Sequence, residues 1–333
     1  MVSANGARFH CVEGVHPEAP AGPLVVLLHG FPQFWWAWRH QLPALTEAGY
    51  RVVAMDLRGY GSSDKPPRGY DTETLTADVA GVIRALGEQD AVVVGHDWGA
   101  WVAWACAGLQ PRTTRAIAVL SMGHPLTMRA AMTRAAHWRT LAQVLAFQAP
   151  WLAERRLTGD GVGELIRRWW GDGTPDPEAV ERYRRAMQLP FVATTSLEYF
   201  RRAARSTGRR EARSLAEALD RPVTCPVLQL HGARDTWVLP SAAARSRRRV
   251  EGPLYAQILP GAGHFLPEEA PEQVTSRLLS WLADVAPLPG VPSTGRRVES
   301  RTESRIGSRV EPAGDSRVES LPGPPPHRLT ARR

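Results

Sequence analysis

Short unbroken runs of apolar residues recur along the chain, each with turn-forming residues on both sides. Such runs are typical of strands that are buried on both faces of a sheet. They predict strands at residues 24–28, 51–55, 91–94, 116–120, 227–230 and 255–259. Amphipathic patterns predict helices at residues 74–86, 99–109 and 271–285. Strands that alternate with helices indicate an α/β fold with a mostly parallel, doubly wound sheet covered on both faces.

Ahead of the first buried run, polar and apolar residues alternate over residues 2–15. The dipeptide Asn5-Gly6 lies within this segment. Asn-Gly favours the tight turn of a β-hairpin, because both residues tolerate a positive φ. The N-terminus is therefore predicted to form a hairpin.

The alternation of strands and helices stops between residues 125 and 221. Patterns there predict helices at residues 128–147, 162–170, 177–187 and 193–206, and no strand. An insertion at this point lies over the carboxyl ends of the strands, where open α/β sheets bind ligands. We therefore predict a core of residues 1–124 and 222–286, with residues 125–221 as a helical cap. Residues 287–333 are predicted to be a disordered tail, because they hold too few apolar residues to offset the entropy of ordering.

The formal net charge of +8 is concentrated in two regions. Residues 125–221 hold seventeen arginines and eleven acidic residues, and residues 287–333 hold nine and five. Neither region interleaves basic with aromatic residues in the way of a nucleic-acid-binding motif. The sequence also contains no run of eighteen apolar residues that could span a bilayer. We therefore expect no nucleic-acid partner and no membrane partner.

The three cysteines, Cys11, Cys106 and Cys225, are scattered, and their spacing predicts neither a disulfide framework nor a metal site. The first residues lack the pattern of a signal peptide. We expect a cytoplasmic protein, monomeric or homodimeric, that needs no metal or organic cofactor. The single lysine, Lys65, and the abundance of Arg, Ala, Gly and Pro are typical of GC-rich bacterial genomes such as those of actinomycetes.

The most specific chemical signal is the segment Gly95-His96-Asp97-Trp98-Gly99, between a predicted buried strand and a predicted helix. Small residues on both sides permit the sharp strand-to-helix turn that lifts the central side chain clear of the backbone. The N-terminus of the following helix stabilises negative charge at this position. Asp97 is therefore the predicted nucleophile.

An aspartate at such a turn limits the reaction. A serine alkylated at a saturated carbon becomes an ether, which water does not readily cleave. An alkylated carboxylate becomes an ester, which water can hydrolyse. Asp97 is therefore suited to displacement at an sp3 carbon of an epoxide or a halide, and amides and ordinary esters are disfavoured as substrates.

Hydrolysis of the ester needs a base for water and donors for the oxyanion. His264 follows the last predicted strand and Asp235 follows the strand before it, in the chain order nucleophile, acid, histidine. Glu268 and Glu269 are the alternative acids, but they precede a helix and are predicted to interact with its dipole.

The predicted oxyanion donors are two backbone N–H groups. One belongs to Phe31, in the loop His29-Gly30-Phe31-Pro32 after the first buried run, and the other to Trp98, the residue after the nucleophile.

Taken together, these segments resemble the epoxide-hydrolase branch of the α/β-hydrolases, a group that also includes haloalkane dehalogenases. The resemblance covers roughly residues 20–285. It implies an α/β-hydrolase fold in which Asp97 attacks, His264 with Asp235 activates water, and an epoxide is opened to a diol. The matching segments are residues 29–32, 34–39, 56–64, 95–99 and 263–264.

The cap departs from the family pattern. Epoxide hydrolases generally protonate the epoxide oxygen with two cap tyrosines, and the resemblance places Gln143 and Phe200 at these two positions. Tyr199 lies one residue earlier, about 100° round a helix. It becomes the candidate cap proton donor only if the register is shifted. The resemblance therefore implies either another way to protonate the leaving oxygen or a substrate that is not a simple epoxide.

Two other functions stay open. Haloalkane dehalogenases hold the halide with the indole N–H of a tryptophan after the nucleophile, which Trp98 could supply. Their second donor is often an asparagine where this chain has Phe31, or a cap tryptophan. A ligand-binding α/β-hydrolase with little turnover would explain the missing tyrosines, although the intact nucleophile, acid and base disfavour it.

Overall fold

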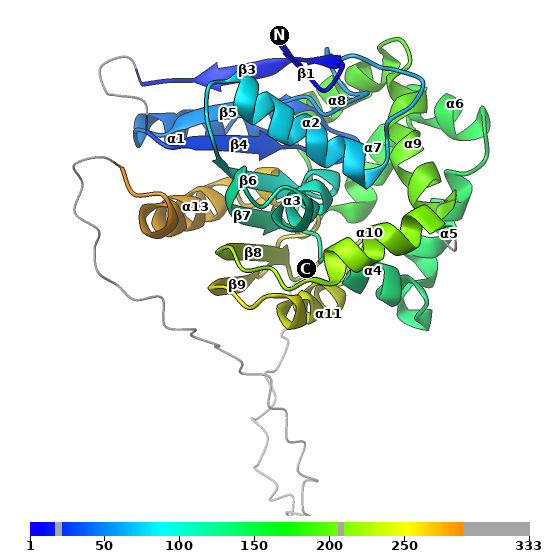
Figure 1. Cartoon of the computed structure of the whole chain (residues 1–333). Coiled ribbons are helices and arrows are strands. Elements are labelled where there is room, and N and C mark those ends of the chain that lie inside the picture. The colour runs from blue at the N-terminus through cyan, green and yellow to red at the C-terminus, as the bar shows by residue number, and fades with distance from the viewer. Residues whose placement is uncertain (17–21, 206–209, 289–333) are drawn as a thin grey trace, which may run out of the picture. The chain divides into compact units, whose positions relative to one another are not determined.

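The computed structural model of the 333-residue chain describes residues 1–16, 22–205 and 210–288. Its main sheet contains seven strands in the order β3-β5-β4-β6-β7-β8-β9 (Figure 1). β3 is antiparallel to β5, and the other neighbouring strands are parallel. The six predicted strands are therefore confirmed, although β9, at the edge of the sheet, is only partly buried. The strands are β3 (Cys11–Gly14), β4 (Leu24–Leu28), β5 (Arg51–Met55), β6 (Ala91–His96), β7 (Thr114–Leu120), β8 (Val227–Gly232) and β9 (Leu254–Leu259).

Side chains of the central strands alternate between two apolar cores, one on each face of the sheet. In β4, Val26 and Leu28 contribute to one core, and Val25 and Leu27 contribute to the other. Because helices cover both faces, β4 is apolar at every position. The helices over the first face are α2 (Thr72–Ala85) and α3 (Trp98–Leu109), and those over the second are α1 (Gln41–Glu47) and α13 (Pro271–Val285) (Figure 1).

The predicted N-terminal hairpin is confirmed for its first half. β1 (Val2–Ala4) pairs with β2 (Ala7–Phe9) in a separate two-stranded sheet. Asn5 and Gly6 form the turn with φ of 47° and 73°. The second half of the predicted segment differs, because β3 leaves the hairpin and joins the main sheet beside β5.

The described residues between β7 and β8 form helices and no strand, as predicted. Figure 1 shows these helices beyond the carboxyl ends of the parallel strands. The predicted single helix over residues 128–147 is wrong, because Arg134 adopts an extended conformation that separates α4 from the next helices. α6 and α10 were not predicted. The helices are α4 (Pro125–Met132), η2 (Ala135–His137), α5 (Trp138–Ala146), α6 (Leu152–Thr158), α7 (Gly161–Trp169), α8 (Pro177–Gln188), α9 (Val192–Arg205) and α10 (Arg210–Asp220).

The predicted start of the tail needs a small correction. Leu288 packs against the second core, so the folded part extends past residue 286. The rest of the predicted tail, residues 289–333, lies outside the described residues. Within the described ranges, no helix combines the length and the apolar character needed to cross a bilayer.

Candidate active site

Asp97 occupies a strained backbone position between β6 and α3. Its φ of 49° and ψ of −116° are unusual for a residue with a side chain. The turn depends on its two glycines. A methyl group at Gly95 would collide with the carbonyl group of Gly99, and one at Gly99 would collide with that of Leu28. The sharp turn inferred from the sequence is therefore present, and it presents the carboxyl group of Asp97 in a buried site.

The two carboxylate oxygens of Asp97 have different surroundings. Oδ2 accepts a hydrogen bond of 2.9 Å from the backbone N–H of Phe31. Oδ1 lies 3.4 Å from Nε2 of His264 and has no hydrogen-bond partner among the described residues. Of the two predicted oxyanion donors, only the Phe31 N–H contacts the carboxylate in the described structure. The Trp98 N–H belongs to the first residue of α3, directly after Asp97.

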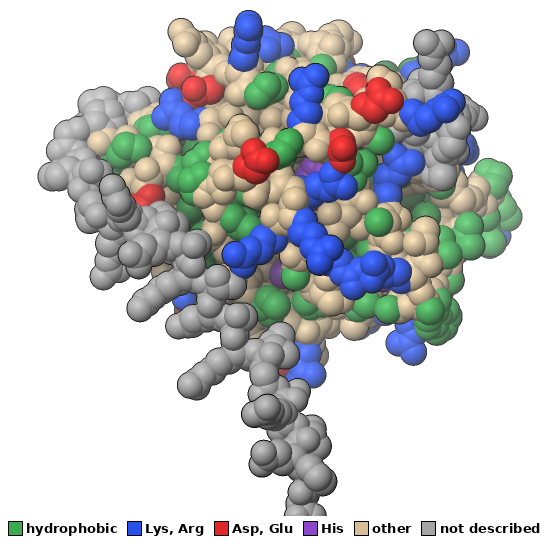
Figure 2. All heavy atoms as spheres, turned by 60° about the horizontal axis from the view of Figure 1, so that its bottom comes forward, with side chains coloured by type: hydrophobic (Ala, Val, Ile, Leu, Met, Phe, Trp, Pro, Cys, Tyr) green, Lys and Arg blue, Asp and Glu red, His purple; other side chains and the backbone are tan. Residues whose placement is uncertain are grey.

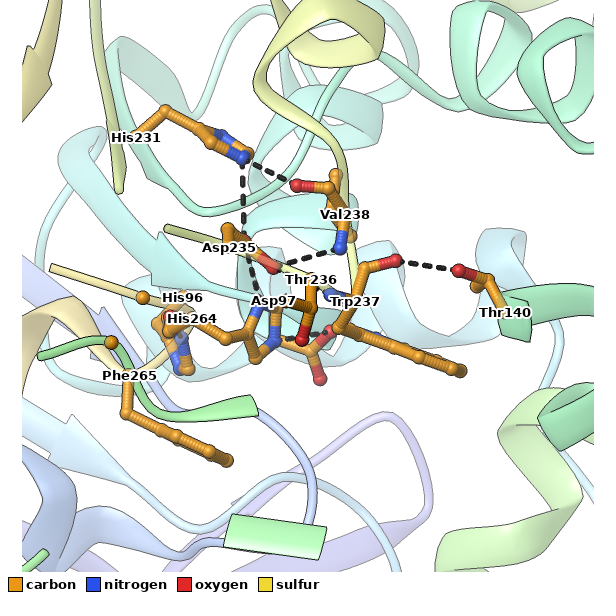
Figure 3. A network of polar contacts seen from close by, with 12 residues as sticks. His96, Asp97, Thr140, His231, Asp235, Thr236, Trp237, Val238, His264 and Phe265 are labelled. Atoms are coloured by element: carbon orange, nitrogen blue, oxygen red, sulfur yellow. Dashed lines mark hydrogen bonds and ion pairs between the residues drawn. The ribbon is translucent and has the colours of Figure 1, made fainter. Parts of the chain in front are cut away.

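His264 lies between Asp97 and Asp235, as Figure 3 shows. Its Nδ1 is 2.9 Å from Oδ2 of Asp235. The other oxygen of Asp235 accepts backbone N–H groups of Trp237 and Val238 at 2.8 and 2.9 Å. These bonds fix the carboxylate, which in turn orients the imidazole. The structure thus brings together the three residues that the sequence proposed as nucleophile, base and acid.

Charge sets the protonation of this site. Burial by itself lowers the pKa of His264, but the charges of Asp235 and Asp97 and the hydrogen bond to Asp235 raise it to about 10. Burial raises the pKa of Asp97, and the nearby imidazole of His264, with the hydrogen bond from the Phe31 N–H, more than offsets this, so that the pKa lies below its ordinary value. The free site therefore holds a protonated imidazole between two carboxylates.

Glu269 binds the loop that carries His264. Its carboxylate accepts three backbone N–H groups, each at 2.7 Å, from Gly263, Phe265 and the cap residue Gly171. The first two flank His264, and the third connects the same carboxylate to the segment after α7. Glu269 lies in α12 (Leu266–Glu269), as a first-turn charge would, but its contacts are with the histidine loop.

Two further bonds connect the cap to the histidine loop. The backbone N–H of His264 donates to the carbonyl oxygen of Trp169 at 2.9 Å, and that of Asp172 donates to Gly261 at 2.7 Å. The ring of Trp169 stacks on that of Trp237 at 4.3 Å. The position of the imidazole therefore depends on cap residues as well as on the core.

Glu268 makes a second connection between core and cap. It accepts hydrogen bonds from the hydroxyl of Tyr183 in α8, from Nε2 of Gln33 at 2.6 Å, and from Arg39 at 3.2 Å. Gln33 follows the loop that supplies the Phe31 N–H. Glu268 was predicted to interact with the dipole of a helix, but its carboxylate binds these three side chains. Asp235, and not Glu268, is the carboxylate that binds Nδ1 of His264.

Aromatic rings form the wall opposite the nucleophile. The ring of Phe200, from α9, lies 5.1 Å from both Phe31 and Trp98, the two predicted oxyanion residues. Phe147, at the end of α5, lies 4.8 Å from Phe200 and 5.5 Å from Phe31. Phe200 thus occupies the place at which the resemblance expected a tyrosine.

The polar side chains of Gln143, at the first predicted tyrosine position, and of Tyr199, next to the second, point elsewhere. The hydroxyl of Tyr199 donates to the carbonyl oxygen of Arg58 at 2.8 Å. The side-chain oxygen of Gln143 accepts from Arg168 at 3.1 Å, in an exposed pair. These contacts argue against Tyr199 as the cap proton donor and agree with the register that places Phe200 in the site.

Sequence reasoning missed Phe147, Trp169 and Trp237 as wall residues and Glu269 as an acceptor for the histidine loop. The cap aromatics gave no distinctive signal, because large apolar residues are also the ordinary material of helix packing. For Glu269 the available signal was an acidic residue five positions after His264, close enough to fold back on the loop.

Comparisons with known proteins place the chain in a family. The model of the alpha/beta hydrolase family matches residues 25–277. Epoxide hydrolase A of Mycobacterium tuberculosis is 33% identical over 314 residues, which cover 85% of this chain and 96% of that protein. The crystal structure of epoxide hydrolase A from Mycobacterium thermoresistibile is similar with a TM-score of 0.69 and 30% identity, over 84% of this chain and 96% of the other.

An epoxide hydrolase from an endophytic Streptomyces is also similar, with a TM-score of 0.70 and 32% identity over 84% of this chain and 93% of the other. These matches confirm the fold class and the family resemblance predicted from the sequence. The family model covers about three quarters of the chain, and the relatives are matched over most of their length. This chain therefore belongs to the α/β-hydrolase family and is a hydrolase of its epoxide-hydrolase-like branch.

Proposed function

We propose that the protein opens an epoxide to a diol through a covalent ester on Asp97. The observation that carries this proposal is the arrangement of Asp97, His264 and Asp235, with an aspartate at the strained turn and an imidazole 3.4 Å from its free oxygen. The names of the relatives support an epoxide as the substrate.

In the first step, Oδ1 of Asp97 attacks a ring carbon of the epoxide. Oδ1 is available for attack, while Oδ2 is held by the Phe31 N–H. A carbon–oxygen bond of the ring breaks, and the leaving oxygen takes up a proton from solvent water. The product of this step is a hydroxyalkyl ester of Asp97.

In the second step, His264 removes a proton from water, which attacks the ester carbonyl. Alkylation removes the negative charge of Asp97, one of the two carboxylates that raise the pKa of His264. The pKa of the imidazole should therefore fall once the ester has formed, so that the imidazole can act as a base. The Phe31 N–H, together with the Trp98 N–H, would stabilise the oxyanion before the diol leaves and Asp97 is restored.

Haloalkane dehalogenation is the second candidate function. The indole Nε1 of Trp98 is buried and has no hydrogen-bond partner among the described residues. A donor in this position, beside the nucleophile, could receive a halide or the oxygen of an epoxide. The indole cannot release its proton as an acid does, so it would stabilise the leaving oxygen without protonating it.

Incubation with a panel of epoxides and a panel of haloalkanes tests the proposal. We expect diol from at least one epoxide and no halide release. Halide release without diol formation would support dehalogenation. Binding of both panels with neither product would indicate a ligand-binding protein with little turnover.

We also infer a cytoplasmic protein from an actinobacterium, monomeric or homodimeric. The three cysteines are free thiols, which suits a reducing compartment. Core residues 1–124 and 222–286 with cap residues 125–221 remain the proposed division. The Asp97 mechanism requires no metal or organic cofactor.

A further inference from the structure

Helix α5 is apolar on the face that it turns away from the protein. Trp138, Leu141 and Leu145, spaced three and four residues apart, are 62%, 40% and 60% exposed. The other face is buried, where Thr140 donates to a core carbonyl oxygen at 2.9 Å and Val144 packs against the core. A surface helix usually turns polar residues to the solvent. The outer face of α5 is therefore an apolar surface that no described residue covers.

This surface continues to the start of α6. Trp151 and Leu152 are 69% and 60% exposed. A hollow of about 70 Å³ lies between the two helices, with Ala146 and Leu152 in its lining. Figure 2 shows hydrophobic side chains gathered at the right-hand edge of the molecule, on the side of the cap helices. The cap apolar patch consists of Trp138, Leu141, Leu145, Trp151 and Leu152.

Arginines surround the cap apolar patch. Residues 134–156 contain four arginines and a single acidic residue, Glu154, which pairs with the buried Arg201 at 2.7 Å. The guanidinium groups of Arg139 and Arg155 lie 5.4 Å from the ring centres of Trp138 and Trp151. Within the described part of the chain, Arg139 and Arg155 form no ion pair. The patch therefore has an apolar centre and a positively charged rim with unneutralised guanidinium groups.

We propose that the cap apolar patch docks on the surface of an anionic phospholipid membrane. Indole and leucine side chains partition into the boundary between headgroups and acyl chains, and guanidinium groups bind lipid phosphates. The patch combines both on one face. This differs from the sequence-based expectation of no membrane partner, which rested on the lack of a segment that could span a bilayer. Docking on a membrane needs no such segment.

Other occupants fit less well. A symmetric dimer through the patch would bring the unpaired arginines of two copies together. Residues 287–333 hold nine arginines and five acidic residues, so this segment is not complementary to a positive rim either. A nucleic acid would match the arginines and the two indoles, but Leu141, Leu145 and Leu152 have nothing to pair with on it. Acyl chains accommodate all five side chains.

Docking would also place the lipid surface next to the hollow behind the wall of the site, and the consequence for the substrate rests on the proposed function. Phe147 lines the hollow between α5 and α6 and also contacts Phe31 and Phe200 in the wall of the site. An apolar epoxide dissolved in the acyl chains would meet the enzyme at this hollow. There the ring of Phe147 separates it from Phe31 and Phe200. The substrates favoured by this arrangement are lipid-soluble epoxides.

Co-sedimentation of the full chain with vesicles tests the docking without any turnover. We expect binding to vesicles of phosphatidylcholine with phosphatidylglycerol, weaker binding in high salt, and little binding to phosphatidylcholine alone. The double variant Trp138→Ser/Leu145→Ser should weaken binding at least about ten-fold. The double variant Arg139→Gln/Arg155→Gln should weaken it roughly twenty-five-fold, since each arginine near an anionic surface contributes about five-fold. Ile258→Ser, which removes a 49% exposed side chain from β9, is the matched control and should leave binding unchanged.

Four results would overturn the proposal. The first is that the wild-type chain does not bind anionic vesicles, and the second is that the Trp138→Ser/Leu145→Ser variant binds them as the wild type does. The third is a dimer, seen by analytical ultracentrifugation, that this variant dissociates, which would assign the patch to a second copy. Binding of a single-stranded oligonucleotide that displaces the vesicles would assign it to nucleic acid. Turnover of a water-soluble epoxide by the same variants reports separately on the proposed function and should equal that of the wild type.

Discussion

The hydroxyl of Tyr199 donates to the carbonyl oxygen of Arg58, and this bond turns the only tyrosine near the expected cap position in α9 away from the nucleophile. Tyr199→Phe should therefore change the rate on simple epoxides less than about two-fold. It should lower the free energy of unfolding by about 1–3 kcal/mol, because a buried carbonyl group loses its partner. Steady-state kinetics and denaturant unfolding measure the two effects. Loss of most activity in a folded variant would make Tyr199 the acid after all.

Phe200→Tyr is the complementary change. A hydroxyl added at this position would face the wall that Phe200 shares with Phe31 and Trp98, where the phenylalanine ring itself offers no acid to the leaving oxygen. General-acid assistance typically contributes about 10²–10⁴-fold, and we expect at least a ten-fold faster alkylation of Asp97 by simple epoxides. Rapid-quench measurement of adduct formation provides the test. An unchanged rate, with the variant folded, would show that protonation does not limit alkylation.

His264→Gln should separate the two steps. Alkylation of Asp97 needs no base, whereas ester hydrolysis does, so the variant should accumulate the covalent ester. Mass spectrometry should show the protein heavier by one substrate molecule, with the adduct on the peptide that contains Asp97. An unmodified protein with full turnover would exclude the mechanism.

The same histidine should respond to the charge of its neighbour. With both carboxylates present, the pKa of His264 is raised to about 10, and Asp97→Asn, which imitates the neutral ester, should lower it markedly. Nuclear magnetic resonance of the labelled imidazole measures both values. Because the folded pKa lies above that of the unfolded chain, the protonated imidazole stabilises the fold at low pH, and this contribution is lost as the pH rises through the folded pKa. An equal pKa in both proteins would contradict the proposed switch.

Glu269→Gln should slow ester hydrolysis more than alkylation. A carboxamide cannot accept all three N–H groups that Glu269 accepts, so the loop that holds His264 should loosen. We expect hydrolysis of the ester to fall by about ten-fold or more, with alkylation changed less than three-fold. Glu272→Gln is the control, since Glu272 is an exposed acidic residue in the first turn of α13. If Glu269→Gln and Glu272→Gln had equal effects, Glu269 would act only as a negative charge near a helix N-terminus and would not position His264.

Deletion of residues 289–333 should leave folding and activity unchanged, because the core already closes with Leu288. Deletion from residue 287 should cost a small part of the stability, since it removes the packing of that leucine. Thermal unfolding and turnover of both truncated chains measure this. Inactivity of the shorter deletion would assign a role to the removed segment.

The sequence predicted the core well because its signals are local. A strand buried on both faces must be apolar throughout, and the turn at Asp97 must have glycine on both sides, so both can be recognised in short windows. The order of Asp97, Asp235 and His264 along the chain was sufficient to predict that they meet.

The cap was harder to predict because its helices owe their boundaries to tertiary contacts. α4 and α5 form a continuous helical pattern, and only the extended conformation of Arg134 separates them. One of the three N–H groups that Glu269 accepts belongs to Gly171, 98 positions away, and no local pattern reveals that contact. For Phe200, family resemblance supplied a prediction that local patterns could not, and its ring contacts those of Phe31 and Trp98.

The phenylalanine rings in the wall of the site also favour binding of the epoxide substrate over binding of the diol product. Phe31, Phe147 and Phe200 present hydrocarbon, which suits an epoxide because its single ether oxygen has no proton to donate. A diol carries two hydroxyl groups, and each loses hydrogen bonds to water on entering such surroundings, at a cost of about 1–3 kcal/mol. The product is therefore held more weakly than the substrate, and accumulated diol should inhibit the enzyme little.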